Sequence, residues 1–455
     1  MIAYFIYYQA VKSEEFIKSP YNVFQDLAGE HVVRGSIVSA DGKTLAETNV
    51  NEEGEEIRSY PQGRLFAHVV GYSTHGKSGL ENQTNFDLLN SHEFILKQIA
   101  NDIQNKKSKG DHVVSSLRYD LQKIAYDGLG DYDGAVVAMD PETGKILAMV
   151  SKPDFDPNTL SEDWESITES DEGILVNRAT QGNFSPGSVF KIITVLEYFR
   201  EHPNDYEKYE YKCSGTISSD DYDKDLSCAL GEVHGTVDLK ESFAESCNTS
   251  FANIGRNLKL SEWNRLCEEL MFNQKLPIDL ESKASSFVLE NSAKERLIMD
   301  TAIGQGKTLV SPLHMLLVTS AIANNGTLME PSLIDHIENA NGVVIETVKP
   351  KTYQNLLSEK EALFLQDYMR SVVTEGTGTK LDVKDYTAYG KTGTAQVESK
   401  KDGKTNAWFV GYAENGDKKL AIAVIVENSG TGSKYAIPIA KSVFAKYFSL
   451  HNEEK

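Results

Sequence analysis

The sequence predicts an α+β protein whose larger domain builds its sheet from strands at both of its ends. Two strongly apolar segments, residues 135–139 and 146–150, are expected to form a β-hairpin. The intervening residues 140–144 (DPETG) have turn chemistry, because proline presets φ and glycine accepts the left-handed region. Two more strands are expected at residues 407–412 and 420–426. Helical patterns fill most of the chain between the two pairs, which is typical of a two-layer α+β domain.

The expected helices of this domain differ in their polarity. Residues 188–199 (SVFKIITVLEYF) are apolar almost all round, so this helix is predicted to lie inside the domain. Residues 177–187, before it, form a polar loop. Further helices are predicted at residues 116–128, 239–258, 261–272, 312–324, 358–374 and 437–449.

The chain before this domain has a different character. Residues 21–110 are polar and interrupted by glycine, with short strands expected at residues 32–38 and 65–72. A helix is expected at residues 91–104, and the basic stretch 105–110 (NKKSKG) has the composition of a linker. A chain of 455 residues is expected to hold more than one domain, at about 150 residues each.

Charge and cysteine content exclude some classes of partner. The 46 basic and 67 acidic residues give a net charge of −21, which repels polyphosphates and argues against nucleic acid as the main partner. The four cysteines form no CxxC pair and have no histidine cluster, so no zinc site is predicted. Cys213 and Cys228 lie in a stretch rich in Asp and Ser. They could form a disulfide in an oxidising compartment or remain free thiols.

The first residues are apolar and rich in tyrosine. A helix over residues 1–11 (MIAYFIYYQAV) would rise only about 17 Å, against a hydrocarbon core of about 30 Å. It lacks the basic region and small-residue cleavage site of a secretory signal. The segment is therefore either a buried or amphipathic helix or the outer half of a membrane anchor whose beginning is missing.

The first chemical motif is a Ser-x-x-Lys at the start of the buried helix, in residues 186–191 (PGSVFK). The i,i+3 spacing places Ser188 and Lys191 on one helix face. A buried lysine near another cation loses its proton easily, and it can then act as the base that a serine nucleophile needs. The N-terminus of the helix adds positive potential where an oxyanion would form.

Two more motifs follow along the chain. Ser246 and Asn248 form a Ser-x-Asn that can pass on a proton and bind a substrate amide. Residues 391–395 (KTGTA), just before the last two strands, suit an edge strand, because Gly393 permits close approach of a substrate backbone while Lys391 attracts a carboxylate. Each motif alone is common by chance, but the three in this order are typical of penicillin-binding proteins and class A β-lactamases.

With these motifs the sequence closely resembles the class B penicillin-binding proteins, the monofunctional peptidoglycan transpeptidases. Further segments fall in the family's order, from residues 34–37 (RGSI) and 41–42 (DG) to residues 78–81 (SGLE), 154–158, 177–179, 303–306 and 323–326. The resemblance covers nearly the whole chain, from about residue 12 to residue 447. The short first region resembles that of the elongation or cell-shape subgroup.

The resemblance implies a fold and a domain organisation. The fold is that of the penicillin-binding and serine β-lactamase-like transpeptidase domain, an antiparallel sheet flanked by helices with an all-helical lobe. We expect a partial membrane anchor at residues 1–17, a small pedestal or dimerisation-like domain at residues 18–110, and the transpeptidase domain at residues 111–455. It also implies a location on the extracytoplasmic face of the cell membrane and a polytopic membrane glycosyltransferase as partner.

The resemblance further implies roles for the first two motifs. Ser188 attacks the D-Ala-D-Ala carbonyl of a stem peptide and becomes acylated, while Lys191 takes its proton. Ser246 relays a proton toward the leaving D-Ala, and Asn248 holds the amide of the acyl side chain. An amine from a neighbouring stem peptide then resolves the ester into a crosslink. β-Lactam antibiotics mimic the donor and acylate Ser188.

The third motif is expected to bind the donor. Lys391 supports the local field, and Thr392 and Thr394 bind the substrate carboxylate beside Gly393. The backbone N–H groups of Ser188 and Thr394 form the oxyanion hole. The resemblance implies neither a metal nor an organic cofactor.

Three rival functions share these motifs. A β-lactamase would direct water onto the acyl-enzyme, and Glu269 with Asn273 has a suitable spacing, although Glu269 is expected on the outer side of an amphipathic helix. A D,D-carboxypeptidase differs only in the acceptor. A non-catalytic sensor or scaffold of the cell-wall machinery is disfavoured, because every catalytic position is intact and no signalling domain is evident.

Overall fold

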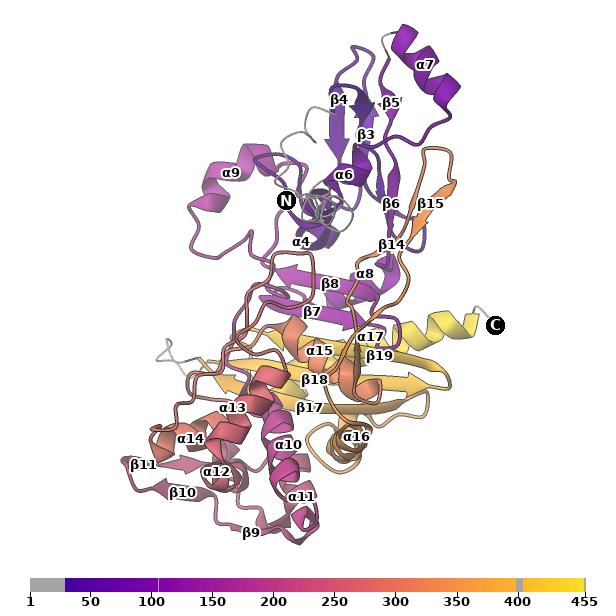
Figure 1. The fold of residues 1–455 in the computed structure, drawn as a ribbon. Helices are drawn as coiled ribbons and strands as arrows, with labels where there is room; N and C mark the ends of the chain where they lie inside the picture. Colours follow the sequence, from indigo (N-terminus) through magenta and orange to yellow (C-terminus); the bar gives the residue numbers. More distant parts are fainter. Residues whose placement is uncertain (1–28, 105, 398–403, 454–455) are drawn as a thin grey trace, which may run out of the picture.

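The fold is described from a computed structural model that covers residues 29–453, apart from residue 105 and residues 398–403 (Figure 1). The expected anchor at residues 1–17 lies outside this range. Within the described part of the chain, no helix combines the length and the apolar character needed to cross a membrane.

A five-stranded antiparallel sheet forms the centre of the larger domain (Figure 1). Its order is β17 (Thr387–Gln396), β18 (Thr405–Asn415), β19 (Lys418–Val426), β7 (Gly134–Met139) and β8 (Ile146–Lys152). The predicted hairpin and the two predicted C-terminal strands are confirmed, and they join in one sheet because β19 pairs with β7. The strand with the KTG segment, β17, lies at an edge, as the sequence predicted.

Helices cover both faces of this sheet. Helices α8 (Tyr119–Leu129) and α17 (Gly432–Glu453) pack together on one face, and the fully buried α15 (Pro312–Ala323) packs on the other. The side chains of successive strand residues point to opposite faces of the sheet. Val136 therefore packs in the layer of α8 and α17, and Val137 packs in the layer of α15. Both layers are built from apolar side chains removed from water, which is the main favourable term in folding.

A helical lobe occupies the end of the domain beside β17 (Figure 1). Its helices are α10 (Lys191–Glu201), α11 (Leu239–Ala244), α12 (Asn248–Asn257), α13 (Leu260–Glu269) and α14 (Glu295–Ala302), while α16 (Glu359–Thr374) packs against α11 and β17. The helical lobe of the expected fold is therefore present, with two small β-ribbons beside α12.

The prediction of one helix over residues 239–258 is wrong. The chain leaves the helix after α11 and begins α12 only at Asn248, because Ser246 adopts a φ of +60°. Left-handed backbone is uncommon for residues other than glycine and usually marks a site where the surrounding structure enforces it. The break places Ser246 on a turn and not on a helix face.

Two small antiparallel ribbons precede this turn, where the sequence predicted no strand. Strand β9 (Glu210–Cys213) pairs with β12 (Gly235–Asp238), and β10 (Thr216–Ser219) pairs with β11 (Tyr222–Ser227). Strand β9 and the β10–β11 ribbon contact α12, so they lie beside the Ser-x-Asn segment.

The first region forms a second sheet with strands from later in the chain. Its order is β15 (Val344–Thr347), β14 (Ile334–Glu338), β6 (His112–Ser115), β2 (Ile37–Val38), β3 (Thr44–Val50) and β4 (Glu56–Ser59). Strand β6 follows the expected domain limit at residue 110, and the β14–β15 hairpin runs along it (Figure 1). The domain limits remain a prediction.

Two expectations for the first region are wrong. The segment predicted as a strand at residues 65–72 is helical, with η2 (Gly63–Phe66) and α4 (Ala67–Val70). Its apolar side chains are buried on several sides, and a short apolar run has no periodicity that separates strand from helix. The basic stretch expected as a linker contributes β5 (Ser108–Lys109), which pairs with β1 (Val32–Val33), whereas the helix expected at residues 91–104 is present as α7 (Ile95–Ile103).

A buried ion-pair network explains two segments of the first region that carried the resemblance. The fully buried carboxylate of Glu81 accepts hydrogen bonds from Nε of Arg34 and from Nε of Arg58, both at 2.7 Å. Asn85 accepts a further bond from Arg34. Two guanidinium groups therefore share one buried carboxylate, and they lower its pKa against the effect of burial.

We expect Glu81→Gln to destabilise the protein by about 3 kcal/mol, because it leaves two buried guanidinium groups without a counter-charge. Urea denaturation of the variant and of the exposed control Glu53→Gln measures the difference. Equal unfolding midpoints for the two variants would show that this network contributes nothing.

Candidate active site

The predicted nucleophile lies on a tight turn before the buried helix. Ser188 belongs to the 3-10 turn η3 (Gly187–Phe190), which leads directly into α10. Gly187 has a φ of +54°, and its N–H donates to the carbonyl oxygen of Gly304 over 2.8 Å. A Cβ on Gly304 would lie 1.9 Å from the carbonyl oxygen of Gly187. The two glycines thus permit the backbone contact that fixes this turn.

Lys191 joins the first motif to the second. It is the first residue of α10 and is fully buried. Its Nζ donates to the carbonyl oxygen of Ser246 at 2.7 Å, to Oγ of Ser246 at 3.1 Å and to Oδ1 of Asn248 at 2.8 Å. The left-handed turn at Ser246 aims these acceptors at the amine, so Ser-x-x-Lys and Ser-x-Asn meet as predicted.

Burial sets the protonation behaviour of Lys191. Removal from water lowers its pKa to about 7, although the nearby Cys247 and Cys228 act in the opposite direction. The ring of Phe251 covers the amine, with Nζ 5.2 Å from its centroid. An amine with this pKa is partly unprotonated near neutral pH, as a general base requires.

The KTG strand lies against the serine turn. Strand β17 packs on η3, and a Cβ on Gly393 would lie 3.0 Å from Cγ1 of Val189 and 3.1 Å from the carbonyl oxygen of Pro186. A Cβ on Gly187 would lie 2.7 Å from the carbonyl oxygen of Thr394. The backbones that carry Ser188 and Thr394 are therefore in close contact. Their N–H groups as an oxyanion hole remain a prediction.

Two polar side chains of β17 complete the cluster. Lys391 is fully buried, and its pKa is lowered by burial and then by the charge of Lys191. Its Nζ lies over the ring of Phe243, 5.6 Å from the centroid. Thr392 shares a 2.6 Å hydrogen bond with the hydroxyl of Thr377, which follows α16. The structure thus brings all three predicted motifs into one site.

Several residues of this site were missed by sequence reasoning. Phe243 and Phe251 cover the two lysines, Thr377 holds Thr392, and Gly304 fixes the serine turn. The aromatic residues have the pattern of ordinary core positions, so nothing in the local sequence marked them. Gly304 belongs to the segment 303–306 that carried the resemblance, which was the one signal that the sequence offered, and the structure shows that it adopts a left-handed φ of +77°.

Three of the four cysteines lie together more closely than their spacing suggested. All four are free, and Sγ of Cys213 lies 3.7 Å from Sγ of Cys228, so this pair is not bonded. Cys247 and His234 lie in the same cluster. The absence of a CxxC pair excluded only a local cluster, because folding brings distant residues together.

The residues of the alternative hydrolytic pair lie elsewhere. Glu269 accepts a hydrogen bond at 2.6 Å from Nη1 of Arg200, near the C-terminal end of α10. Ser188 precedes the other end of this helix, about 15 Å away by helix rise. Asn273 bonds to the backbone of Phe287. The expectation that Glu269 lies on the outer side of its helix is confirmed.

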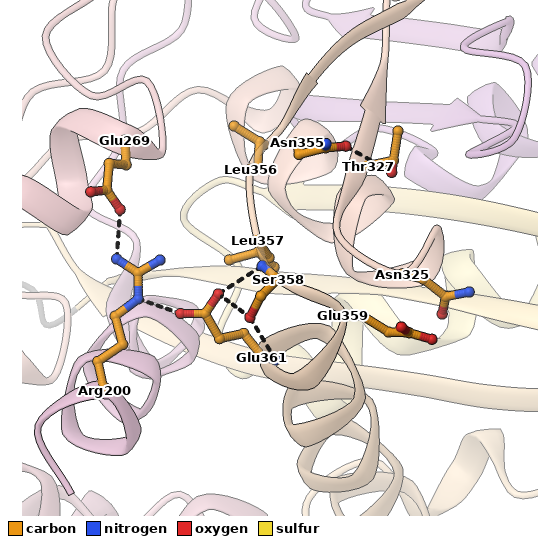
Figure 2. A pocket seen from close by; sticks show the side chains of 10 residues that line it. All are labelled: Arg200, Glu269, Asn325, Thr327, Asn355, Leu356, Leu357, Ser358, Glu359 and Glu361. Carbon is orange, nitrogen blue, oxygen red and sulfur yellow. Dashed lines mark hydrogen bonds and ion pairs between the residues drawn. The ribbon is translucent and has the colours of Figure 1, made fainter. Parts of the chain in front are cut away.

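A polar pocket of about 510 Å³ lies at that same end of α10 (Figure 2). Figure 2 shows Arg200 between Glu269 and Glu361, with hydrogen bonds to both carboxylates. The pocket is lined by Arg200, Glu269, Asn325, Thr327, Asn355, Leu356, Leu357, Ser358, Glu359 and Glu361. None of these belongs to the three motifs, so we assign the chemistry to the cluster around Ser188 and not to this pocket.

The fold and the cluster define a serine acyltransferase of the penicillin-recognising class. The family model "Penicillin binding protein transpeptidase domain" matches residues 134–448, and the model "Penicillin binding protein A dimerisation domain" matches residues 34–113. The chain belongs to the penicillin-binding protein family, and the expected membership of its class B is confirmed.

Characterised relatives align along most of the chain. It is 29% identical over 444 residues to the peptidoglycan D,D-transpeptidase PbpA of Mycolicibacterium smegmatis, covering 90% of this chain and 88% of that protein. It is 30% identical over 434 residues to the stage V sporulation protein D of Bacillus subtilis, covering 88% of this chain and 65% of that protein.

Solved structures give the same fold. The D,D-transpeptidase domain of a peptidoglycan glycosyltransferase from Eggerthella lenta superposes with a TM-score of 0.80 at 28% identity, covering 92% of this chain and 98% of that one. The imipenem acyl-enzyme complex of penicillin-binding protein A from M. tuberculosis superposes with a TM-score of 0.81 at 26% identity, covering 90% and 98%.

Proposed function

We propose that this protein is a peptidoglycan D,D-transpeptidase that crosslinks stem peptides through an acyl-Ser188 intermediate. One observation carries the proposal: Lys191, three residues after Ser188, is buried and bonded to both Ser246 and Asn248. The arrangement supplies a nucleophile, a base and a proton relay within one cluster.

In the acylation step, unprotonated Lys191 accepts the proton of the Ser188 hydroxyl as Oγ attacks the carbonyl carbon of the penultimate D-Ala. The negative charge that develops on the carbonyl oxygen is stabilised by the N–H groups of Ser188 and Thr394. The C–N bond then breaks, and a proton reaches the leaving D-Ala amine through Ser246. The acyl group remains on Ser188 as an ester.

Resolution of the ester reverses the proton path. The amine of a second stem peptide attacks the ester carbonyl and loses its proton toward the lysine. The Ser188 alkoxide leaves and regains a proton, so the enzyme is restored and one new amide bond is formed. Exclusion of water from the ester distinguishes this outcome from hydrolysis.

The edge strand offers a place for the donor. As an edge strand of the sheet, β17 could pair with an extended peptide backbone, a recurring mode of peptide recognition. The hydroxyls of Thr392 and Thr394 would bind the terminal carboxylate beside Gly393. Lys391 would contribute positive electrostatic potential to this place. Asn248 would hold the acyl side-chain amide, and its Nδ2 already donates to the carbonyl oxygen of Ser227 over 3.1 Å.

We place the protein on the extracytoplasmic face of the cell membrane, held by an anchor that includes residues 1–17, with a polytopic glycosyltransferase as partner. The apolar, tyrosine-rich sequence of residues 1–11 supports the anchor. The glycosyltransferase is proposed because a crosslinking enzyme needs glycan strands as they are made.

Fluorescent penicillin tests the acyl-enzyme and separates the rival hydrolase. We expect a label that survives denaturation and persists for many minutes, because Glu269 is engaged by Arg200 far from Ser188. Rapid release of hydrolysed drug would favour a β-lactamase, and absence of any label would favour a non-catalytic scaffold.

A further inference from the structure

Helix α7 of the first region turns its apolar side chains toward solvent. Leu96, Ile99 and Ile103 recur at the spacing of one helix face, and Phe94 directly precedes the helix. The exposed fractions of these side chains are 64% for Leu96, 49% for Ile99, 80% for Ile103 and 67% for Phe94. Surface helices normally bury such a stripe, whereas the described part of the chain leaves this one largely uncovered. An exposed apolar face of this kind marks an interaction surface.

The polar side of α7 is the one that packs on the protein. Nε2 of Gln98 donates to the carbonyl oxygens of Ser91 and Glu93, over 2.9 Å and 3.0 Å. Nδ2 of Asn101 donates to Oε2 of Glu93 over 3.4 Å, and the buried carboxylate of Glu93 also pairs with Lys97. These contacts fix the helix with its apolar stripe outward, since turning the stripe inward would break all of them.

Helix α7 lies at the end of the molecule opposite the helical lobe (Figure 1). The described chain begins beside it, because Nζ of Lys107, just after the helix, donates to the carbonyl oxygen of Gly29 over 2.7 Å. With the anchor proposed at residues 1–17, the connecting residues 18–28 can span at most about 40 Å. This connection would keep the apolar stripe of α7 near the surface of the bilayer that holds the anchor.

The sequence at α7 is basic although the whole chain is acidic. Residues 94–109 contain four lysines and one aspartate, against a net charge of −21 for the chain. The side chains of Lys97, Lys106, Lys107 and Lys109 are exposed. One nearby carboxylate, that of Glu56 on β4, is paired with Lys107 over 2.6 Å. Lysines beside an exposed apolar helix face are typical of helices that lie in the interface of an anionic bilayer.

We propose that α7 is an interfacial helix that inserts Phe94, Leu96, Ile99 and Ile103 into the surface of an anionic phospholipid bilayer. This contact rests on the membrane location proposed above and adds a second point of attachment to it. Burial of the four apolar side chains provides the main attraction, and the lysines add a smaller electrostatic part. Two attachments would limit tilting of the protein and hold the helical lobe away from the bilayer.

A second copy of the chain fits this face less well than a lipid surface. A helix of nine residues offers a face about 14 Å long and about 10 Å wide. A stable protein interface buries about 800 Å² on each partner, several times this area. A lipid surface needs no such area, because an amphipathic helix binds it through its apolar stripe alone.

Hydrogen exchange of the full chain tests this contact, with and without vesicles of phosphatidylglycerol and phosphatidylcholine. We expect the backbone N–H groups of residues 95–103 to exchange about tenfold more slowly when vesicles are present. The combined variant Ile99→Ser and Ile103→Ser should lose this protection. Both side chains are exposed, so its thermal unfolding should match wild type. The matched control Leu363→Ser, on an exposed apolar residue of α16, should keep the protection.

Flotation of the same samples separates this contact from the proposals on which it rests. Protein that floats with the vesicles while α7 exchanges at an unchanged rate would overturn the α7 contact and leave the anchor intact. Protein that does not float would overturn both membrane contacts. Protection that appears without vesicles as the protein concentration rises would identify a second copy as the occupant and overturn the lipid contact. Neither assay needs catalysis, so failure of the transpeptidase proposal would leave these results unchanged.

Discussion

Replacement of Ser188 by alanine is expected to abolish covalent labelling by fluorescent penicillin completely. No other hydroxyl of the cluster has the position of Ser188, on the turn before α10 and in front of the buried Lys191. Ser246 accepts a hydrogen bond from the lysine but lies on a separate turn. Because the variant removes a single oxygen from a partly exposed side chain, we expect its thermal unfolding to match wild type.

The matched control is Ser185→Ala in the same loop. Ser185 donates a hydrogen bond to the carbonyl oxygen of Gly304 over 2.9 Å, so its loss tests whether damage to the loop alone stops labelling. We expect this variant to keep most of its labelling, and peptide mass spectrometry of the labelled protein should place the drug on Ser188. A label that remains on Ser188→Ala would contradict our assignment of the nucleophile.

Replacement of Lys191 by methionine is expected to lower the acylation rate by about 10²–10⁴-fold, the range over which a positioned general base accelerates a reaction. Methionine is an unbranched, flexible apolar residue that can fill the space, so the helix core should remain packed. The variant also leaves three acceptor atoms, on Ser246 and Asn248, without their donor. A moderate loss of stability is therefore expected beside the kinetic effect.

The pH dependence of acylation separates a base from a merely structural lysine. The titratable groups near Lys191 are Cys247 and Cys228, which act to raise its pKa, and Lys391 on β17, whose own pKa the charge of Lys191 lowers. Since burial lowers the pKa of Lys191 to about 7 and the unprotonated amine is the base, the wild-type rate should rise as pH increases through about 7. In Lys191→Met this rise should vanish, and the surface variant Lys434→Met should keep it. A wild-type rate that is flat between acidic and alkaline pH would contradict this role.

The sheet could be predicted from the sequence because its strands are short, continuous apolar runs bounded by turn residues. The hairpin of β7 and β8 and the C-terminal pair β18 and β19 are of this kind. The segment at residues 65–72 looked the same and forms helix, since burial on several sides removes the period that separates the two states. The β14–β15 hairpin joins the first region across a long sequence separation, and no local pattern carries such information.

The three motifs could be predicted to meet because their residue types carry chemistry and their order is diagnostic. The geometry of their contacts could not be predicted from the sequence. Ser246 was expected on a continuous helix, whereas its left-handed turn gives Lys191 two further acceptors. The grouping of Cys213, Cys228, His234 and Cys247 was missed for a related reason: these residues come from four separate segments, and the β9–β12 pairing brings two of them together.

The active site must attract negatively charged peptides, although the net charge of the whole chain is negative. The protein carries a net charge of −21, and its substrate peptides end in carboxylates. Attraction of the donor must therefore be local, as the sequence indicated. Because burial lowers the pKa of both Lys191 and Lys391, the lysines supply less positive charge than their number suggests. Hydroxyl groups and backbone N–H groups at β17 must then contribute more of the binding.

Crosslinking of nascent peptidoglycan tests the proposed activity most directly. The protein is incubated with uncrosslinked, lipid-linked glycan strands made by a glycosyltransferase, and the muropeptides are separated after digestion. We expect crosslinked dimers with wild type, and none with Ser188→Ala or after treatment with penicillin. Release of terminal D-Ala without any dimers would identify a carboxypeptidase and contradict the transpeptidase function proposed for this site.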